Sequence, residues 1–276
     1  MRLRLLAPTL GLCVTAAAGG KPPPRVQVTA VPELTSVTPG ASFRVAVRLR
    51  IPDGYHISWT NPGQSGLPTT IAWRTPAGIA VEGTQWPYPE RDVSAGLVGH
   101  VYRGEVVLVT RFRVDPSIRR GRTTDLRAVL TWGVCGDDCF SQRDTVALTL
   151  RVGGAPPEVA RVWRGVVRSL DKLPAQDTTL RMKATLRGDS VHLTVTGAAL
   201  RGTPPSAATF FPLPHGAAAV TAVQPVPGGL AFMLPADILS APVGPLKGVL
   251  VADRPWLADS RRRALTVQAT VPLPMP

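Results

Sequence analysis

Hydrophobic and polar residues alternate along several short segments of the chain. Between Phe43 and Ile51 every second residue is apolar, and arginines occupy most of the positions between them. A period of two is typical of a β-strand with one face in a hydrophobic core and the other in solvent. Comparable patterns predict further strands at 106–114, 125–134, 145–152, 179–186, 190–196, 217–224, 229–234, 247–251 and 264–271.

Turn-forming residues separate these predicted strands. Pro52-Asp53-Gly54 and Asn61-Pro62-Gly63 have the composition of turns, and Gly188-Asp189 suits a two-residue hairpin turn. Short strands at this spacing favour antiparallel β-sandwiches over helical folds. They fall into two groups of ordinary domain size. We therefore predict an all-β protein with two antiparallel β-sandwich modules, over residues 25–153 and 175–276.

One segment between these modules has the periodicity of a helix. Pro157 and Glu158 suit the first turn of a helix that extends to Leu170. We expect it to form a helical connector over residues 154–174, packed between the modules. Its apolar face would consist of Val159, Val162, Trp163, Val166, Val167 and Leu170.

The first 20 residues have the three parts of a signal peptide. Arg2 and Arg4 precede an uncharged apolar run, and Ala16-Ala17-Ala18 offers the small residues that a signal peptidase recognises. The run is shorter than the roughly 20 apolar residues of a membrane anchor. Cys13 would leave with this segment, and no later segment is long and apolar enough to span a membrane. We predict an exported, periplasmic protein that is not itself membrane-spanning.

The formal net charge of +13 raises the question of nucleic-acid binding. The basic residues are mostly arginines scattered along the predicted strands, with small clusters only at 119–122 and 261–263. Nucleic-acid-binding proteins usually concentrate their basic residues on one helix or groove and place aromatic residues among them. We therefore expect no nucleic-acid partner, and we assign the arginines to solvated strand faces and loops.

Cys135 and Cys139 are the two cysteines outside the predicted signal peptide. In an exported protein such a pair can be oxidised. Four residues of extended strand span about 13 Å, whereas a disulfide needs Cα atoms within about 7 Å. The chain must turn between the cysteines, and Gly136-Asp137-Asp138 favours a turn. We predict that both sulfurs lie at the end of a β-hairpin or in a single tight turn.

The spacing of the pair leaves its role open between redox exchange and a structural disulfide. A bridge across so small a loop stabilises the fold by only about 2 kcal/mol, against about 4.7 kcal/mol for a 100-residue loop. The carboxylates of Asp137 and Asp138 disfavour a thiolate, so we expect the attacking thiolate to come from a partner. A metal site is the third possibility, although none of the histidines is at ligand spacing from the pair: His56, His100, His192 and His215.

Several motifs in the first predicted module occur together in one protein family. They are Asp53-Gly54-Tyr55-His56, the run from Trp59 to Thr69, Trp86-Pro87-Tyr88-Pro89, Gly99-His100-Val101-Tyr102, Glu105-Val106-Val107-Leu108 and the run from Trp132 to Cys139. This combination resembles the N-terminal periplasmic domain of the thiol:disulfide interchange protein DsbD, especially its ScsB-like branch. The likeness covers residues 25–153. We expect the tryptophans of these motifs to pack in the core, and Asn61-Pro62-Gly63 to form a turn.

The resemblance implies an immunoglobulin-like sandwich for this region. We expect neither a cofactor nor a metal. The resemblance also implies that Cys135 and Cys139 accept electrons from a membrane-embedded donor and pass them to periplasmic thioredoxin-like proteins. A loop that caps the disulfide in this family would fall at 90–100. The residues expected to surround the pair and to contact the partner are Tyr55, Leu97, Val98, Tyr102, Asp137, Asp138 and Phe140.

Two functional hypotheses follow. The first is a periplasmic thiol–disulfide exchange carrier with a reversible Cys135–Cys139 disulfide. Complete family members continue into a multi-helix membrane domain and often a thioredoxin-like domain, and we find neither pattern in this sequence. We therefore expect either that another polypeptide supplies the electrons or that the role has been lost. The alternative is a non-catalytic exported β-sandwich adaptor in which the disulfide is structural and the second module binds a partner.

Overall fold

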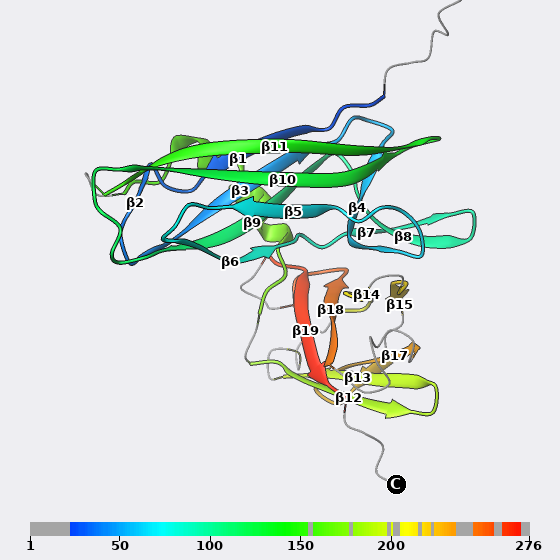
Figure 1. Ribbon diagram of the computed structural model, residues 1–276. Helices are drawn as coiled ribbons and strands as arrows, with labels where there is room; N and C mark the ends of the chain where they lie inside the picture. Colours follow the sequence, from blue (N-terminus) through cyan, green and yellow to red (C-terminus); the bar gives the residue numbers. More distant parts are fainter. Residues whose placement is uncertain are drawn as a thin grey trace, which may run out of the picture.

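The computed structural model confirms an all-β architecture with two modules (Figure 1). The predicted signal peptide lies outside the residues that the structure describes. These are 23–153, 157–176, 179–197, 200, 205–214, 217–221, 224–235, 245–256 and 261–271.

The first module consists of two sheets packed face to face. The smaller sheet has the order β1-β3-β9-β6, with β1 (Gln27–Pro32), β3 (Ser42–Arg50), β9 (Glu105–Val114) and β6 (Ile79–Gln85). The larger sheet has the order β2-β11-β10-β4-β8-β7, and β5 also pairs with β10. Its strands are β2 (Ser36–Val37), β11 (Cys139–Val152), β10 (Thr123–Cys135), β4 (His56–Gly63), β8 (Leu97–Tyr102), β7 (Glu90–Ser94) and β5 (Thr70–Arg74).

The alternating pattern of the sequence accounts for the core between these sheets. Along β10, the even-numbered residues from Leu126 to Val134 are buried, whereas Asp125 and Arg127 are exposed. Aromatic side chains fill the space between the sheets: Trp73 of β5 lies edge-on to Phe112 of β9 with 4.9 Å between ring centroids, and Phe43 of β3 stacks on Phe112 at 5.2 Å. Burial of this face provides the main stabilisation of the module.

The connector differs from the helix predicted over 157–170. It forms two 3₁₀ helices, η1 (Arg161–Gly165) and η2 (Val167–Lys172). A 3₁₀ helix repeats every three residues, so Ala160, Trp163 and Val166 are buried. The predicted face is therefore wrong for three of its members, which are exposed: Val159, Val162 and Val167.

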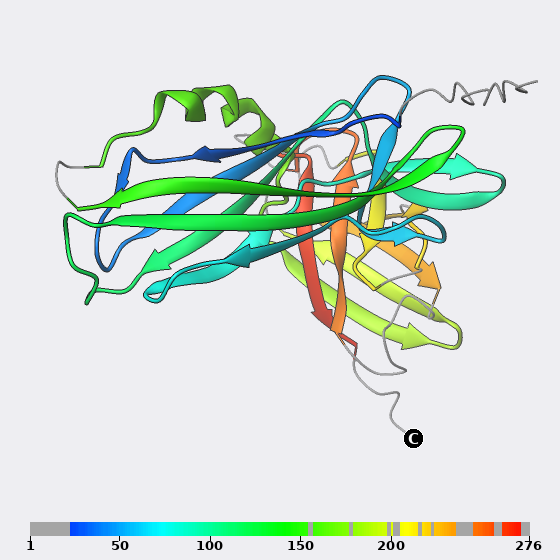
Figure 2. The same cartoon turned by 45° about the horizontal axis from the view of Figure 1, so that its top comes forward.

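The connector packs on the outer face of the smaller sheet rather than between the modules (Figure 2). Trp163 and Val166 form one cluster with residues of β1, β3 and β9. The guanidinium carbon of Arg44 lies 5.3 Å from the centroid of the Trp163 ring. The connector therefore belongs to the first module by its packing, and it precedes the first strand of the second module in the chain.

The second module has two four-stranded sheets. One has the order β12-β13-β17-β16, with β12 (Arg181–Arg187), β13 (Ser190–Thr196), β17 (Gly229–Pro235) and β16 (Gln224–Val226). The other has the order β15-β14-β18-β19, with β15 (Val220–Thr221), β14 (Ala208–Pro212), β18 (Pro245–Ala252) and β19 (Ala264–Thr270). Of the strand predicted at 217–224, residues 217–219 lie outside any strand, Val220–Thr221 form β15 and Gln224 begins β16, whereas 222–223 lie outside the described residues.

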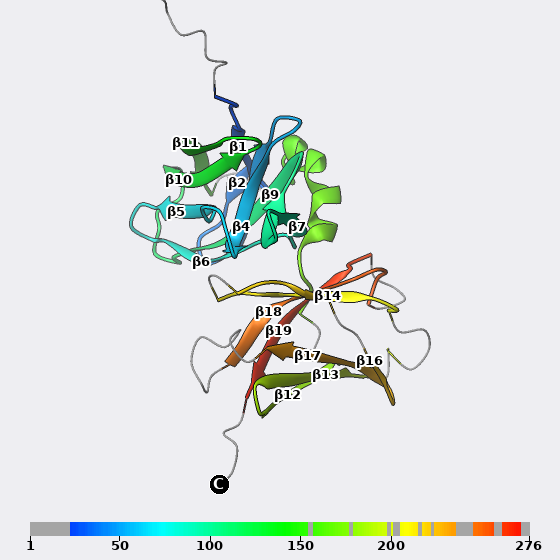
Figure 3. The same cartoon turned by 90° about the vertical axis from the view of Figure 1, so that its right-hand side faces the viewer.

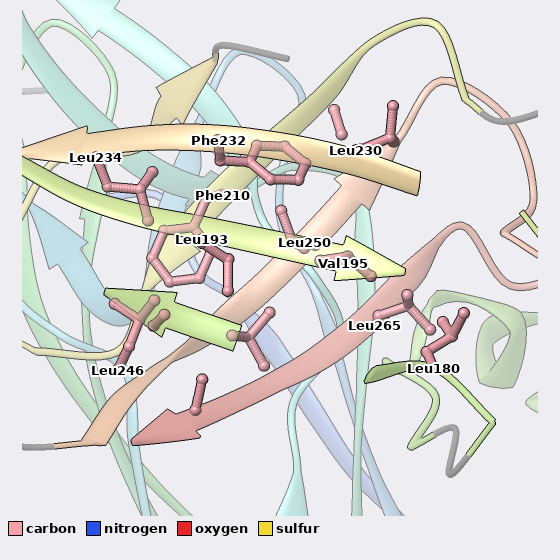
Figure 4. Packing of buried hydrophobic residues seen from close by; sticks show 14 of the residues in the cluster. Leu180, Leu193, Val195, Phe210, Leu230, Phe232, Leu234, Leu246, Leu250 and Leu265 are labelled. Atoms are coloured by element: carbon pink, nitrogen blue, oxygen red, sulfur yellow. The ribbon is translucent and has the colours of Figure 1, made fainter. Parts of the chain in front are cut away.

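Large apolar side chains from both sheets fill the core of this module, including Leu193, Phe210, Phe232 and Leu250 (Figure 4). Arg187 pairs with Ser190 across the predicted Gly188-Asp189 turn, where Gly188 has a φ of 60°. A glycine adopts this left-handed conformation without strain.

The two modules lie one above the other in Figure 3, and they share a buried contact. Phe211 of β14 lies edge-on to the rings of Trp59 and His100, at centroid distances of 6.3 Å and 5.3 Å. The side chain of Asn61 is fully buried, and its Nδ2 donates hydrogen bonds to Pro212 O at 2.7 Å and to the carbonyl of residue 217 at 3.1 Å. The prediction of a turn at Asn61 is therefore wrong. This residue lies within β4, and its side chain forms hydrogen bonds with the second module.

Candidate functional site

The β10–β11 hairpin brings the two cysteines together. Cys135 and Cys139 are directly opposite each other at the end of the antiparallel pair. They form a disulfide with a Cα–Cα distance of 4.1 Å. Between them the chain reverses direction, and Gly136 N donates a hydrogen bond to Asp138 O at 2.9 Å. The predicted hairpin end is confirmed.

The two cysteines differ in their exposure to solvent. Cys135 is only 7% exposed, whereas Cys139 belongs to the exposed face of β11. An incoming thiolate must approach the attacked sulfur along the S–S axis, so access decides which sulfur reacts. Of the two sulfur atoms, that of Cys139 is therefore the more accessible to an incoming thiolate.

His56 lies next to the disulfide. The sequence did not predict this proximity, because His56 and Cys135 are far apart along the chain. His56 is the register partner of Cys135 on the neighbouring strand β4. Directly opposite residues of an antiparallel pair are about 5 Å apart and share a face of the sheet. Partial burial lowers the pKa of His56, the positive charge of Arg103 lowers it further, and Asp92 opposes the change. The imidazole beside Cys135 is therefore predominantly neutral at pH 7.

Tyr55 and Phe140 pack around the end of the hairpin. A Cβ atom built on Gly136 would lie 3.0 Å from two ring carbons of Tyr55, so the ring covers the turn where no side chain is present. Phe140 is opposite Val134 and packs with Tyr55 against the core. Asp137 and Asp138 are exposed in the turn. Of the expected site residues, these four are in or against the disulfide hairpin.

Residues 90–100, expected to form a loop that caps the disulfide, belong instead to two paired strands and the turn between them. The strands form the hairpin β7–β8, and β4 separates β8 from β10 within the sheet. Val98 packs against the same core cluster as Tyr55 and Phe140, and Leu97 is 44% exposed. Tyr102 is buried and donates a hydrogen bond to Pro87 O at 2.6 Å, and burial raises the pKa of its hydroxyl. Leu97, Val98 and Tyr102 therefore lie on the far side of β4 from the cysteine pair.

A residue that the sequence patterns did not single out lies on the face of the sheet that carries the disulfide. Leu67 belongs to the loop between β4 and β5 and is 53% exposed. A Cβ atom on Gly133 would lie 3.2 Å from Leu67 Cβ, so the leucine rests on the backbone two residues before Cys135. The sequence could not show that Leu67 lies beside Gly133, because this proximity depends on the pairing of strands that are distant along the chain.

The described part of the chain contains neither a membrane-spanning helix nor a metal-binding cluster. No helix in that part has the length and apolar character needed to cross a membrane. Among the same residues there is no group of three or more His, Cys, Asp or Glu side chains placed to hold a metal ion.

Comparisons with known proteins identify a family model that matches the first module and a solved structure whose fold resembles both modules. Residues 25–151 match the family model described as thiol:disulfide interchange protein DsbD, N-terminal. The N-terminal periplasmic domain of ScsB from Proteus mirabilis is similar over 89% of this chain and 93% of its own, with a TM-score of 0.62 and 17% identity. This likeness shows that both modules share its fold.

The DsbD N-terminal domain of Neisseria meningitidis in its reduced form is 21% identical over 48% of this chain and 90% of its own, with a TM-score of 0.25. The same domain in complex with the PilB N-terminal domain, also from Neisseria meningitidis, gives the same identity and TM-score. A search of curated protein sequences gave no match.

Proposed function

Because residues 25–151 form a domain of the DsbD N-terminal type, we propose that this protein is a periplasmic thiol–disulfide exchange carrier. The observation that carries the proposal is the disulfide at the end of the β10–β11 hairpin, with one sulfur in the exposed face and the other protected. A bridge that spans four residues adds little stability to a module with a large core. Its position suits reversible exchange.

Electron uptake begins when a thiolate of a reduced donor attacks Cys139 Sγ. A mixed disulfide forms between the donor and Cys139, the Cys135–Cys139 bond breaks, and Cys135 leaves as a thiolate that takes up a proton. The second thiol of the donor then attacks the mixed disulfide and releases Cys139. The donor leaves as a disulfide, and the carrier holds two thiols and two more electrons.

Electron delivery is the reverse of this sequence. The Cys139 thiolate attacks the disulfide of an oxidised acceptor, and Cys135 then resolves the mixed disulfide. Asp137 and Asp138 disfavour a free thiolate at the hairpin, and the neutral His56 adds no compensating charge. The reduced carrier is therefore a weak nucleophile, and its reaction depends on docking of the partner. The partners in this proposal are a membrane-embedded donor and thioredoxin-like acceptors.

Single-cysteine variants test the proposal. Cys135→Ala keeps the exposed Cys139, and the matched variant Cys139→Ala keeps only the protected Cys135. Each is mixed with a thioredoxin-like protein that retains only its attacking cysteine, activated as a mixed disulfide with 5-thio-2-nitrobenzoate. We expect Cys135→Ala to form the protein–protein disulfide at least tenfold faster than Cys139→Ala. If neither variant reacts faster than the uncatalysed exchange of a small thiol, the carrier function is refuted.

The reduction potential separates the carrier from an adaptor with a structural disulfide. Structural disulfides of exported proteins have potentials below about −300 mV, whereas thioredoxin-like proteins span roughly −270 to −120 mV. We expect the reduction potential of the Cys135–Cys139 couple to lie in the range of thioredoxin-like proteins, measured by equilibration with glutathione or dithiothreitol buffers. A potential below about −300 mV would support the adaptor.

A further inference from the structure

The loop between β4 and β5 is held in a fixed shape. Gly63 has a φ of 82°, and a Cβ atom there would clash with Val98 O. Gly66 has a φ of 102°, and a Cβ atom there would lie 2.6 Å from Ser58 Oγ. Gln64 N donates to Val98 O at 2.9 Å, and Val98 N donates to Gln64 Oε1 at 2.9 Å. The loop therefore places its side chains without a large entropic cost on binding.

Leu67 is the large apolar side chain that this loop presents to solvent. It lies on Gly133, whose missing side chain leaves the space that the leucine occupies. Gly133 and Cys135 are two residues apart on β10 and share a face of the sheet, so about 7 Å of strand separates them. Leu67 is thus an exposed apolar contact point on the face of the sheet that holds both cysteines.

The rest of this face carries three arginines among threonines, Ala72, Val129 and Ala147, with Asp125 at its far end. Thr70 of β5 and Thr131 of β10 share a hydrogen bond of 2.7 Å between their hydroxyls, and Arg143 is the partner of Thr131 on β11. Arg74 and Arg127 follow farther along β5 and β10. All three arginines are exposed, and none of them forms an ion pair with another residue in the described ranges. A partner that covers this face would be complementary if it carried carboxylates.

The β7–β8 hairpin offers a second set of exposed apolar residues, Val93 at 54% and Leu97 at 44% exposure. β4 lies between this hairpin and β10. Its strand β8 contributes His100 to the contact with the second module, through the ring of Phe211. The hairpin is therefore less suited than the Leu67 loop to meet a protein that approaches Cys139.

We propose that a thioredoxin-like partner docks on the outer face formed by β5, β10 and β11. The apolar surface beside its attacking cysteine contacts Leu67, and its acidic side chains face Arg143, Arg127 and Arg74. This inference rests on the proposed exchange function and names the surface through which that function selects its partner.

Rates of reduction by two reductants test the proposal. The oxidised full chain is reduced by a thioredoxin-like protein with an acidic surface, and separately by dithiothreitol, which needs no docking surface. Leu67→Asp is compared with its matched control Leu97→Asp, since both leucines are about half exposed. Circular dichroism and thermal unfolding of each variant confirm that it is folded.

We expect Leu67→Asp to slow reduction by the protein about tenfold, because a leucine contact is lost and a carboxylate is placed opposite an apolar surface. Leu97→Asp should change this rate less than twofold, and both variants should react with dithiothreitol at the wild-type rate. Arg143→Gln should lower the protein rate about threefold at low salt and reduce its dependence on ionic strength.

The outcomes separate the two proposals. If the thioredoxin-like protein reduces the wild-type chain no faster than an equal concentration of dithiothreitol, the exchange function itself fails. If the wild-type chain reacts rapidly but Leu97→Asp slows it as much as Leu67→Asp does, the docking face is wrong and the exchange function stands. The docking face is equally wrong if Leu67→Asp has no effect on the protein rate.

Discussion

Two hairpins extend from one end of the first module, and they have opposite surroundings (Figures 1 and 2). The β10–β11 hairpin is long, is exposed along one face and ends in the Cys135–Cys139 disulfide. The β7–β8 hairpin is short, and its strand β8 is held by β4 and by the second module. One hairpin presents a disulfide at its exposed end, whereas the other contributes to the contact between the two modules.

We infer from this contrast that two parts of one sheet have different roles, one in stability and the other in reactivity. His100 of β8 has no solvent exposure, and its Nδ1 donates a hydrogen bond of 2.9 Å to Asn61 O. The side chain of Asn61 in turn binds carbonyls of the second module. Contacts that involve β8 should therefore govern stability, and changes at the β10–β11 hairpin should govern reactivity. The following substitutions test this separation.

Phe211→Ala should have the largest effect on the module contact. It removes an aromatic ring that lies edge-on to both Trp59 and His100 and leaves a cavity between the modules. We expect a loss of about 4 kcal/mol in the free energy of unfolding, measured by urea denaturation of the full chain. The rate of reduction of the folded protein by dithiothreitol should be unchanged. A faster rate would show that the two hairpins are coupled.

Acidification should weaken the same contact through His100. Burial lowers the pKa of His100 to about 4, while the hydrogen bond to Asn61 raises it and Arg91 lowers it. The unfolded chain binds a proton near pH 6.5, so it gains protons before the folded state does. The stability is fully present above this pH and falls by about 3 kcal/mol as the pH approaches 4.

Urea denaturation of the wild type and of His100→Gln between pH 7 and pH 4.5 checks this prediction. The variant lacks the titrating group, so its stability should depend less on pH over this range. Equal pH dependence in the two proteins would exclude His100 as the cause.

Asn61→Ala should have a moderate effect. It removes the two hydrogen bonds donated to the second module and the one that Gly63 N donates to Asn61 Oδ1. We expect a loss of about 2 kcal/mol, visible as a lower urea midpoint. Thr70→Ala serves as the control, because its hydrogen bond to Thr131 is exposed. A loss of similar size in both variants would contradict a special role for Asn61.

The smallest effect is expected at the disulfide hairpin. The double variant Asp137→Asn with Asp138→Asn removes two exposed negative charges beside the sulfurs. We expect the thiol pKa of the reduced protein to fall by a few tenths, measured by the pH dependence of alkylation, with no change in stability. A wild-type thiol pKa well below 7 would show that the aspartates do not control the cysteines.

The sequence alone determined the class of fold and the turn that joins the two cysteines. Strict alternation along 43–51 and 125–134 identifies strands, because a strand with one buried face must repeat every two residues. The spacing of Cys135 and Cys139 required a turn, because an extended chain cannot bring the sulfurs within bonding distance. Both conclusions depend on local geometry and need no knowledge of distant residues.

Only the tertiary structure decided what lies beside the pair and what the motif from Trp59 to Thr69 does. The pairing of His56 with Cys135, the packing of Leu67 on Gly133 and the bonds from Asn61 to the second module join residues that are distant in sequence. Strand order and register create these contacts, and a one-residue change of register would reverse every face. The connector shows the same limit, because its 3₁₀ repeat follows from packing on β1, β3 and β9.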